Sequence, residues 1–191
     1  MAESPESRLS RFLSLVLRHK PETIGIQLNQ AGWTNVTALL KALNNHARPC
    51  TLELLAKIVA EDEKGRYEYS ENKQMIRAAQ GHSLKVNLGY KPEQPPHELY
   101  HGTPYRFITS IKQMGLTKQK RHAVHLSPNK ETAAIVGARR GSAIILAVNT
   151  KQMFQDGYVF YQSSNGVWLT DQVPAKYINF HNSEPAGNQR S

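Results

Sequence analysis

The sequence predicts an α+β protein built from two lobes. In the first half, three stretches repeat apolar residues at helical spacing, and two short strand-like runs follow them. Beyond a proline-rich extended segment at 91–96, apolar strand-like runs alternate with short helices only. We therefore expect one lobe at residues 1–90, a second lobe with a strand-rich core at 91–182, and a disordered tail at 183–191.

The first helix is indicated by four apolar residues at positions i, i+3, i+4 and i+7, with residues 1–7 expected to be frayed. Its end is set by Pro21, which disfavours helical backbone at the residue before it. The alternating run at 24–28 predicts a short strand. The four apolar residues are Leu9, Phe12, Leu13 and Val16.

The rest of the first lobe consists of two more helices and a hairpin. Asn35 and Thr51 are good N-caps for helices that continue the apolar periodicity, and the second of these ends in the charged turn at 61–65. The runs at 66–70 and 74–78 flank a polar turn and predict a β-hairpin. Three helices and a hairpin form a winged helix, although the acidic residues of the third helix do not favour binding to duplex DNA.

The second lobe is predicted from five strand-like segments and two helices. A helix over 107–114 is expected to end at Gly115, and Ser127 with Pro128 has the N-cap and first-position pattern of another. The strand-like segments are 98–101, 123–126, 143–148, 158–160 and 166–169.

Composition limits the possible functions. The 191 residues carry a net charge of +9, and +7 of it lies in residues 85–191, which favours a polyanionic partner. Cys50 is the one cysteine, so an intramolecular disulfide is excluded. No apolar run reaches the roughly 18 residues of a membrane span and no signal peptide opens the sequence, so we expect a cytoplasmic protein without membrane contact.

Cationic side chains at the end of the first helix allow two interpretations. Arg18 and His19 either stabilise the negative end of the helix dipole or form an anion site. Arg66, next to Lys64 and Gly65 at the start of the hairpin, is either a solvated residue or a phosphate contact.

Polar residues beside the predicted strands of the second lobe are equally open to two interpretations. His101, Gly102 and Thr103 form either a strand-ending turn or a place where the backbone approaches a ligand closely. Ser127 either caps a helix or marks a helix N-terminus that favours phosphate. Arg139, which precedes the most apolar strand, has the planar fork that binds phosphate oxygens. The histidines lack acidic or thiolate companions at ligand spacing, so no metal site is expected.

Seven blocks in the same order closely resemble the KptA family of NAD-dependent RNA 2′-phosphotransferases. The resemblance covers about residues 8 to 180, and its specificity comes from the number and order of the blocks. Position 140 departs from the family pattern, where histidine is common and this chain has arginine. The blocks are 12–21, 32–33, 64–67, 76–83, 99–103, 124–127 and 136–141.

The resemblance implies a winged-helix lobe followed by a lobe similar to ADP-ribosyltransferases, with the active site between them. It implies that an internal RNA 2′-monophosphate attacks the nicotinamide ribose of NAD, which is consumed as a co-substrate, and releases nicotinamide. The ribose 2″-hydroxyl then attacks the phosphate of this 2′-phospho-ADP-ribosylated RNA, giving RNA with a free 2′-hydroxyl and ADP-ribose 1″,2″-cyclic phosphate.

The resemblance also assigns residues to roles. Arg18, His19 and Arg66 match family residues that hold the RNA 2′-phosphate and assist the second step, and Arg139 matches a fourth. A further group matches positions that bind NAD; no individual roles follow for Gln80, His82 and Arg140. The NAD-binding group is His101, Gly102, Thr103 and Ser127.

Two other functions remain open at this stage. One is an ADP-ribosyltransferase that modifies nucleic-acid ends or protein and stops after the first step; the other is a winged-helix regulator that senses NAD. Residues 158–175 offer only Asp171 as a carboxylate, which favours an already anionic acceptor such as phosphate. We expect a monomer acting on tRNA-like RNA with an internal 2′-phosphate.

Overall fold

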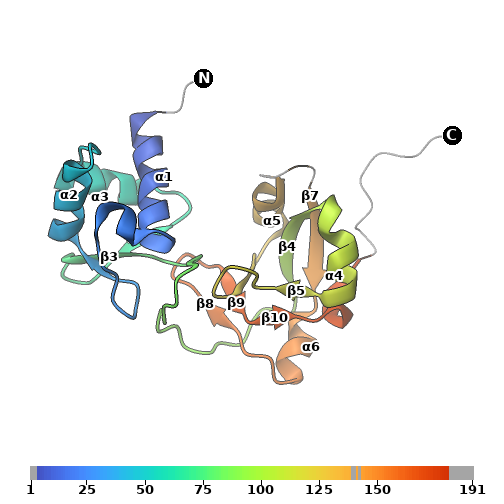
Figure 1. Cartoon of the computed structure of the whole chain (residues 1–191). Helices are drawn as coiled ribbons and strands as arrows, with labels where there is room; N and C mark the ends of the chain where they lie inside the picture. Colours follow the sequence, from blue (N-terminus) through green and yellow to red (C-terminus); the bar gives the residue numbers. More distant parts are fainter. Residues whose placement is uncertain (1–3, 139–140, 142, 181–191) are drawn as a thin grey trace. The chain divides into compact units, whose positions relative to one another are not determined.

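Figure 1 shows a computed structural model of the chain, in which residues 4–138, 141 and 143–180 are described. Helices and small antiparallel sheets are both present, which confirms the α+β class. Internal contacts divide the chain into two compact units. Unit 1 is Met1–Tyr90 with Lys120–His122, and unit 2 is Lys91–Gln119 with Ala123–Ser191.

The helices of unit 1 begin where the sequence provides capping side chains. Asn35 accepts a hydrogen bond from the Ala38 amide at 3.0 Å, and Thr51 accepts one from Leu54 at 3.2 Å, which confirms both predicted N-caps. The expected fraying of residues 5–7 is wrong, because the Ser4 hydroxyl caps a helix that starts at proline. The helices are α1 (Pro5–Arg18), η1 (Pro21–Ile24), α2 (Val36–Asn45) and α3 (Leu52–Ala60).

The predicted strand at 24–28 is also wrong. Residues Pro21–Ile24 form the 3₁₀ helix η1, which ends at Gly25 in the left-handed region at φ 70°. The amides of Gly25 and Ile26 donate to the carbonyls of Glu22 and Pro21, so local hydrogen bonds take the donors that a strand would need.

The predicted hairpin of unit 1 is confirmed. Its strands pair antiparallel with Tyr67 opposite Ala78, and a third short strand joins the second one to give the order β1-β3-β2. Apolar residues from α1, α2, α3 and β3 bury one core, in which Leu13, Leu39 and Ile76 have no exposed surface. The strands are β1 (Thr34–Asn35), β2 (Tyr67–Tyr69) and β3 (Met75–Ala78).

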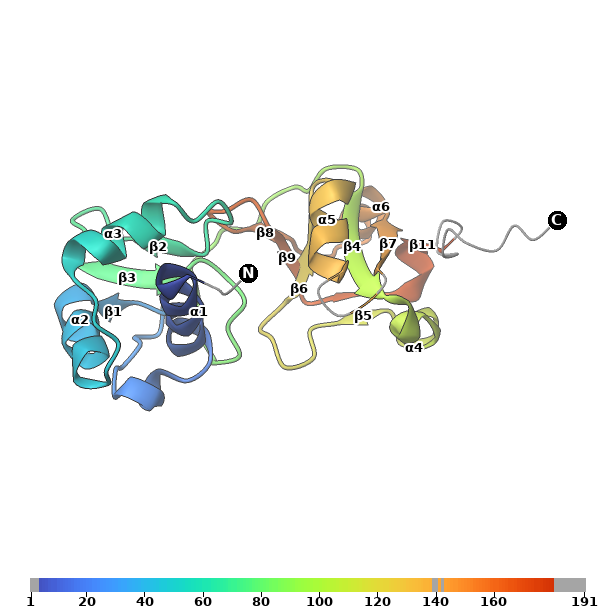
Figure 2. The same cartoon turned by 90° about the horizontal axis from the view of Figure 1, so that it is seen from above.

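The described residues of unit 2 form three small antiparallel sheets, ordered β11-β7-β4, β6-β9-β8 and β10-β5. Figure 2 shows α5 lying along β4, beside the first of these sheets. The strands are β4 (Leu99–Pro104), β5 (Leu116–Thr117), β6 (Val124–Leu126), β7 (Ala143–Val148), β8 (Tyr161–Gln162), β9 (Trp168–Thr170), β10 (Gln172–Val173) and β11 (Ile178–Asn179). The helices are η2 (Tyr105–Phe107), α4 (Ile108–Met114), α5 (Lys130–Gly137), α6 (Thr150–Gln155) and η4 (Ala175–Tyr177).

Most elements of unit 2 match the expected ones, with boundary shifts. The helix ending at Gly115 is confirmed as α4. The strand expected at 158–160 starts later, at Tyr161, because the Tyr158 amide still closes the end of α6 by donating to Met153. Within the described ranges, no helix has the length and apolar character needed to cross a membrane. The predicted disordered tail lies outside the described residues.

Candidate functional site

Two of the candidate residues lie at the C-terminal end of α1. Arg18 is the last helical residue, and His19 caps the helix by donating its amide hydrogen to the Leu15 carbonyl at 2.9 Å. The Arg18 carbonyl accepts from the amide of Ser83 at 3.0 Å. Both side chains are thus fixed to a rigid helix by backbone contacts at its end.

The Arg18 guanidinium is crowded by other cations. Burial lowers its pKa, and the charges of Arg66 and Arg121 lower it further, against an opposing contribution from Tyr67. Its Nη2 donates to the Arg66 carbonyl at 3.4 Å, while its buried Nε has no hydrogen-bond partner among the described residues. A buried donor without an acceptor, beside like charges, is costly unless an anion binds there.

His19 is oriented by a neighbouring hydroxyl. Its Nδ1 lies 2.9 Å from the Ser83 hydroxyl oxygen. Partial burial lowers the pKa of the ring, and the charges of Arg18 and Arg121 act in the same direction. The imidazole is therefore mostly neutral near pH 7, which is the state that accepts a proton.

Arg66 approaches Arg18 from the start of the hairpin. Its Nε donates to Oδ1 of Asp62 at 2.8 Å, and its Nη2 donates to the Ser10 hydroxyl at 3.2 Å. The hydrogen bond to Asp62 raises the pKa of Arg66, although burial opposes it. The structure thus brings Arg18, His19 and Arg66 close together within unit 1, and their function as one anion site stays a prediction.

Tyr67 ties this strand to α1. Its hydroxyl lies 2.7 Å from the Ser14 hydroxyl oxygen and also donates to the Ser10 carbonyl. The Arg66 guanidinium lies over the Tyr67 ring, 5.7 Å from the centroid. These contacts fix the spacing between α1 and β2, and with it the spacing between Arg18 and Arg66.

His82, whose role the sequence left open, is fully buried behind the cluster. Neither ring nitrogen has a hydrogen-bond partner among the described residues, and the ring meets His122 edge to face at 6.0 Å. Burial is the main cause that lowers its pKa to about 3. A neutral ring in this place adds no further charge to the cationic cluster.

In unit 2, His101 lies on β4 and its ring contacts the backbone of β6. Its Nδ1 lies 3.0 Å from the His125 carbonyl oxygen. Because a carbonyl only accepts, Nδ1 carries the hydrogen, and in the neutral ring Nε2 is the acceptor. The interpretation of residues 101–103 as a strand-ending turn is wrong, since all three lie inside β4 and pair with β7.

Gly102 is required by the packing of α5. A Cβ at this position would lie 1.8 Å from the Ala133 carbonyl oxygen, and one at Gly137 would lie 2.9 Å from the Gly102 Cα. No side chain fits between strand and helix here, because the two backbones are in contact.

Gly102→Ala is expected to lower the free energy of unfolding of unit 2 by about 2–3 kcal/mol, because α5 must move away from β4. Gly166→Ala is a matched control: its Cβ would meet nothing within 4 Å, so it loses only about 1–2 kcal/mol from backbone strain at φ 76°. Urea unfolding of both variants measures the difference. Equal losses would show that the strand and helix separate without cost.

Thr103 and Ser127 differ in accessibility. Thr103 is buried, with 4 % of its surface exposed, whereas Ser127 is half-buried. The expectation that Ser127 caps a helix is wrong, because Asn129 caps α5 and the Ser127 backbone pairs with Tyr100. This pairing brings Ser127 to the strand that carries His101.

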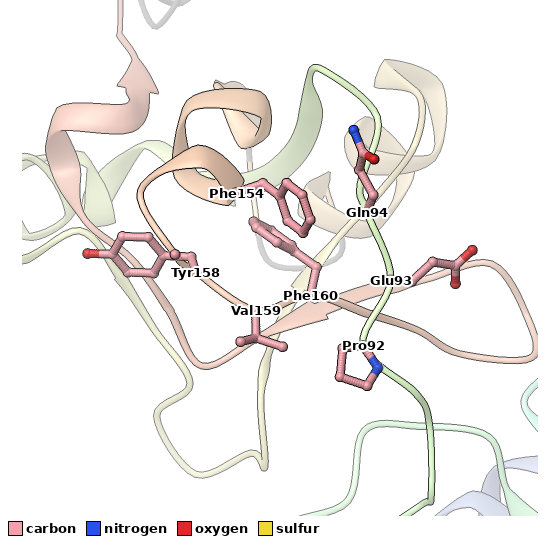
Figure 3. Close-up of a pocket in the computed structure, with 8 residues that line it drawn as sticks. Pro92, Glu93, Gln94, Phe154, Tyr158, Val159 and Phe160 are labelled. Atoms are coloured by element: carbon pink, nitrogen blue, oxygen red, sulfur yellow. The ribbon is translucent and has the colours of Figure 1, made fainter.

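One candidate residue and one pocket are not among the groups described above. Arg139 lies outside the described residues. A pocket of about 230 Å³ in unit 2 is formed by residues 92–94 on one side and by Phe154 and residues 157–160 on the other (Figure 3). It includes no candidate residue and no cationic side chain, so it does not suit a phosphate group. Over the described ranges, no three His, Cys, Asp or Glu side chains gather to hold a metal ion.

Three residues of the cluster were missed from the sequence: Asp62, Ser83 and Arg121. Ser83 contacts His19, which is distant in sequence, and Asp62 contacts Arg66 four residues further on; no periodic signal marks either contact. Arg121 is different, because residues 118–122 concentrate cations and histidine, and this short basic run was a usable signal.

The fold and the cationic cluster define the chain as an α+β protein with a site suited to a phosphate group. The model of the RNA 2′-phosphotransferase, Tpt1 / KptA family matches residues 4–172. The chain belongs to this family and is an enzyme, and the family supports removal of a 2′-phosphate from RNA.

Relatives of high similarity support this assignment. A protein of Flavobacterium johnsoniae named "Probable RNA 2′-phosphotransferase" is 47% identical over 94% of this chain and 99% of its own length. Proteins of the same name from Fusobacterium nucleatum and Agrobacterium fabrum are 48% and 47% identical, over 91% and 95% of this chain and 97% of their own lengths.

Proposed function

We propose that this enzyme transfers an internal RNA 2′-monophosphate to NAD in two steps. In the first, a phosphate oxygen bonds to C1″ of the nicotinamide ribose while the bond to nicotinamide breaks. In the second, the 2″-hydroxyl attacks phosphorus and the bond to the RNA 2′-oxygen breaks. The products are 2′-hydroxyl RNA, nicotinamide and ADP-ribose 1″,2″-cyclic phosphate.

The observation that carries the proposal is the burial of Arg18 beside two other arginines with an unsatisfied Nε donor. Two guanidiniums, from the end of α1 and the start of the hairpin, present donors that match a phosphate dianion, and the imidazole of His19 lies next to Arg18. Each step leaves negative charge on the phosphate, and the second step concentrates it on a five-coordinate phosphorus, which the guanidiniums stabilise.

His19 fits the proton transfers of the second step. The attacking 2″-hydroxyl must lose a proton, and the departing RNA 2′-oxygen must gain one. A ring whose lowered pKa keeps it neutral near pH 7 accepts the first of these protons. Because Nδ1 is engaged by the Ser83 hydroxyl, we assign the proton transfer to Nε2.

NAD is assigned to the β4 region of unit 2. The half-buried Ser127 pairs with Tyr100 of β4, and His101 of β4 is included because it matches the NAD-binding strand of the family. Gly102 is already explained by α5, and Thr103 is buried, so their contribution as NAD contacts rests on the family resemblance alone. Arg139 retains its proposed role as a fourth phosphate-binding residue on the same ground.

The proposal also includes a fold assignment for each of the two units. Three helices and a three-stranded sheet with a hairpin support a winged-helix assignment for unit 1. The small antiparallel sheets of unit 2 support an assignment as the lobe resembling ADP-ribosyltransferases.

The test is an incubation with NAD and an oligoribonucleotide that carries one internal 2′-phosphate, followed by mass analysis of RNA and small-molecule products. The proposal predicts equal amounts of dephosphorylated RNA, nicotinamide and cyclic phosphate. A stable ADP-ribosylated RNA as the final product of the unmodified enzyme would instead support an ADP-ribosyltransferase that stops after the first step. Omitting NAD is the control, and full phosphate removal without it would contradict the proposal.

A further inference from the structure

A carboxylate lies inside the cationic cluster, where it opposes the binding of a phosphate. Only 2 % of the Asp62 side chain is exposed. Burial by itself raises the pKa of this carboxyl, but hydrogen bonds from Arg66 and the Arg66 charge lower it overall, so Asp62 is ionised at neutral pH. A buried negative charge at an anion site requires an explanation.

The Asp62 carboxylate holds Arg66 at three points. Oδ1 accepts from Nε at 2.8 Å and lies 2.7 Å from Nη2, and Oδ2 accepts from the Arg66 backbone amide. Both the main chain and the side edge of the guanidinium are therefore fixed. The remaining terminal nitrogen, Nη1, has no hydrogen-bond partner among the described residues, and it is the end left for a substrate.

The same contacts extend to Arg18. The carbonyl of Arg66, whose amide Asp62 binds, accepts from Arg18 Nη2 at 3.4 Å and from the Ala79 amide at 2.9 Å. The backbone of Arg66, through its amide on one side of Cα and its carbonyl on the other, thus links the carboxylate to the second guanidinium. Moving Asp62 by one methylene would release both.

We propose that Asp62 is a positioning residue that holds Arg66, and through the Arg66 carbonyl Arg18, in the geometry needed to stabilise the phosphate in the second step. This inference rests on the proposed function. The Asp62 carboxylate then has two effects of opposite sign. Its negative charge weakens binding of the RNA phosphate, whereas the guanidinium geometry that it fixes speeds the reaction.

The experiment compares the unmodified enzyme with five variants in single-turnover reactions with NAD and 2′-phosphorylated RNA, following the ADP-ribosylated RNA and the final product. Asp62→Asn removes the charge, and Asp62→Glu keeps the charge but displaces it. Both are expected to slow the second step about tenfold or more, so that the intermediate accumulates. For Asp62→Asn, the affinity for the RNA is expected to stay equal or increase.

Glu63→Gln is the matched control, because Glu63 is an exposed acid one residue away and its replacement changes the net charge equally. Its rates are expected to equal those of the unmodified enzyme. The double variant Asp62→Asn with Arg66→Ala is expected to lose less than the product of the two single losses, since most of the carboxylate's contacts act on the Arg66 side chain and only its contact with the amide of residue 66 remains.

The outcomes distinguish a failure of the proposed function from a failure of the role proposed for Asp62. If the unmodified enzyme does not convert the RNA, the proposed function itself fails. If it does, and folded Asp62→Asn and Asp62→Glu carry out the second step within twofold of its rate, Asp62 does not position Arg66. Additive losses in the double variant would likewise overturn the proposal. Circular dichroism and thermal unfolding identify any variant that does not fold, and either Asp62 variant alone suffices.

Discussion

Replacing Arg18, His19 or Arg66 by alanine is expected to stop the reaction after its first step, so that the 2′-phospho-ADP-ribosylated RNA accumulates. Removing one preorganised donor from a developing oxyanion costs about 100- to 1,000-fold in rate, and losing a general base costs a similar factor. Rapid quenching of a single turnover with end-labelled RNA measures the rise and decay of the intermediate.

The same alanine substitutions are expected to lower the rate of the first step less than that of the second. The phosphate is already anionic, so it needs no base to become a nucleophile, and the bond that breaks is to nicotinamide. The second step needs both charge stabilisation and proton transfer at the same phosphorus. The guanidiniums of Arg18 and Arg66 and the ring of His19, which lie close together, are the groups proposed for these tasks.

Lys41→Ala is the charge-matched control, because Lys41 is an exposed cation on α2 whose loss changes the net charge equally. It is expected to keep both rates. A folded Arg18→Ala, His19→Ala or Arg66→Ala variant that completes the second step at the normal rate would remove that residue from the site.

Local signals in the sequence predicted much of unit 1. Asn35 and Thr51 mark helix starts because a capping side chain satisfies amides within three residues of itself. The hairpin strands were predicted because their turn and alternation are local as well. The wrong prediction of a strand at 24–28 also has a local cause, because alternation over five residues does not distinguish a strand from a 3₁₀ turn followed by Gly25.

Features that depend on distant partners were not predictable in this way. Gly102 has a plain structural reason, the contact with Ala133 of α5, but a glycine in a strand-like run does not show which backbone approaches it. Asp62 appeared to be one acid in a charged turn, and only its contacts with Arg66 distinguish it from Glu63. The resemblance to a family supplied Arg18, His19 and Arg66 as a set, and the structure supplies the contacts between them.

Acidification is expected to destabilise unit 1 through His82. Burial lowers the pKa of this ring to about 3, and the charges of His122, Arg18, His19 and Arg77 act in the same direction. In the unfolded chain the ring has its ordinary pKa near 6.5. Between pH 6.5 and 3 the unfolded state therefore binds a proton that the folded state does not. The stability that depends on a neutral His82 is fully present above pH 6.5 and is lost as the pH falls.

The loss from His82 amounts to about 5 kcal/mol across that range, which is comparable to the whole stability of a small domain. His82→Leu is expected to abolish this dependence, because the ring nitrogens have no partners among the described residues and an apolar side chain replaces them without breaking a hydrogen bond. His46→Gln, on the exposed end of α2, is the control and is expected to keep the dependence.

Urea unfolding between pH 7 and 4, followed by pulsed hydrogen exchange in peptides from α1 and α2, gives the stability of unit 1 separately. The difference in free energy of unfolding between the unmodified protein and His82→Leu reports on this ring alone. Carboxyls such as Asp62 contribute equally to both proteins, and because the pKa of Asp62 is lowered, its stabilisation is lost only at still lower pH. Identical pH profiles for the two proteins would mean that His82 has the same pKa in the folded and unfolded states, so that the folded protein carries a protonated ring below about pH 6.5. The cluster around Arg18 would then contain another positive charge, and its repulsion would strengthen the requirement for a bound anion.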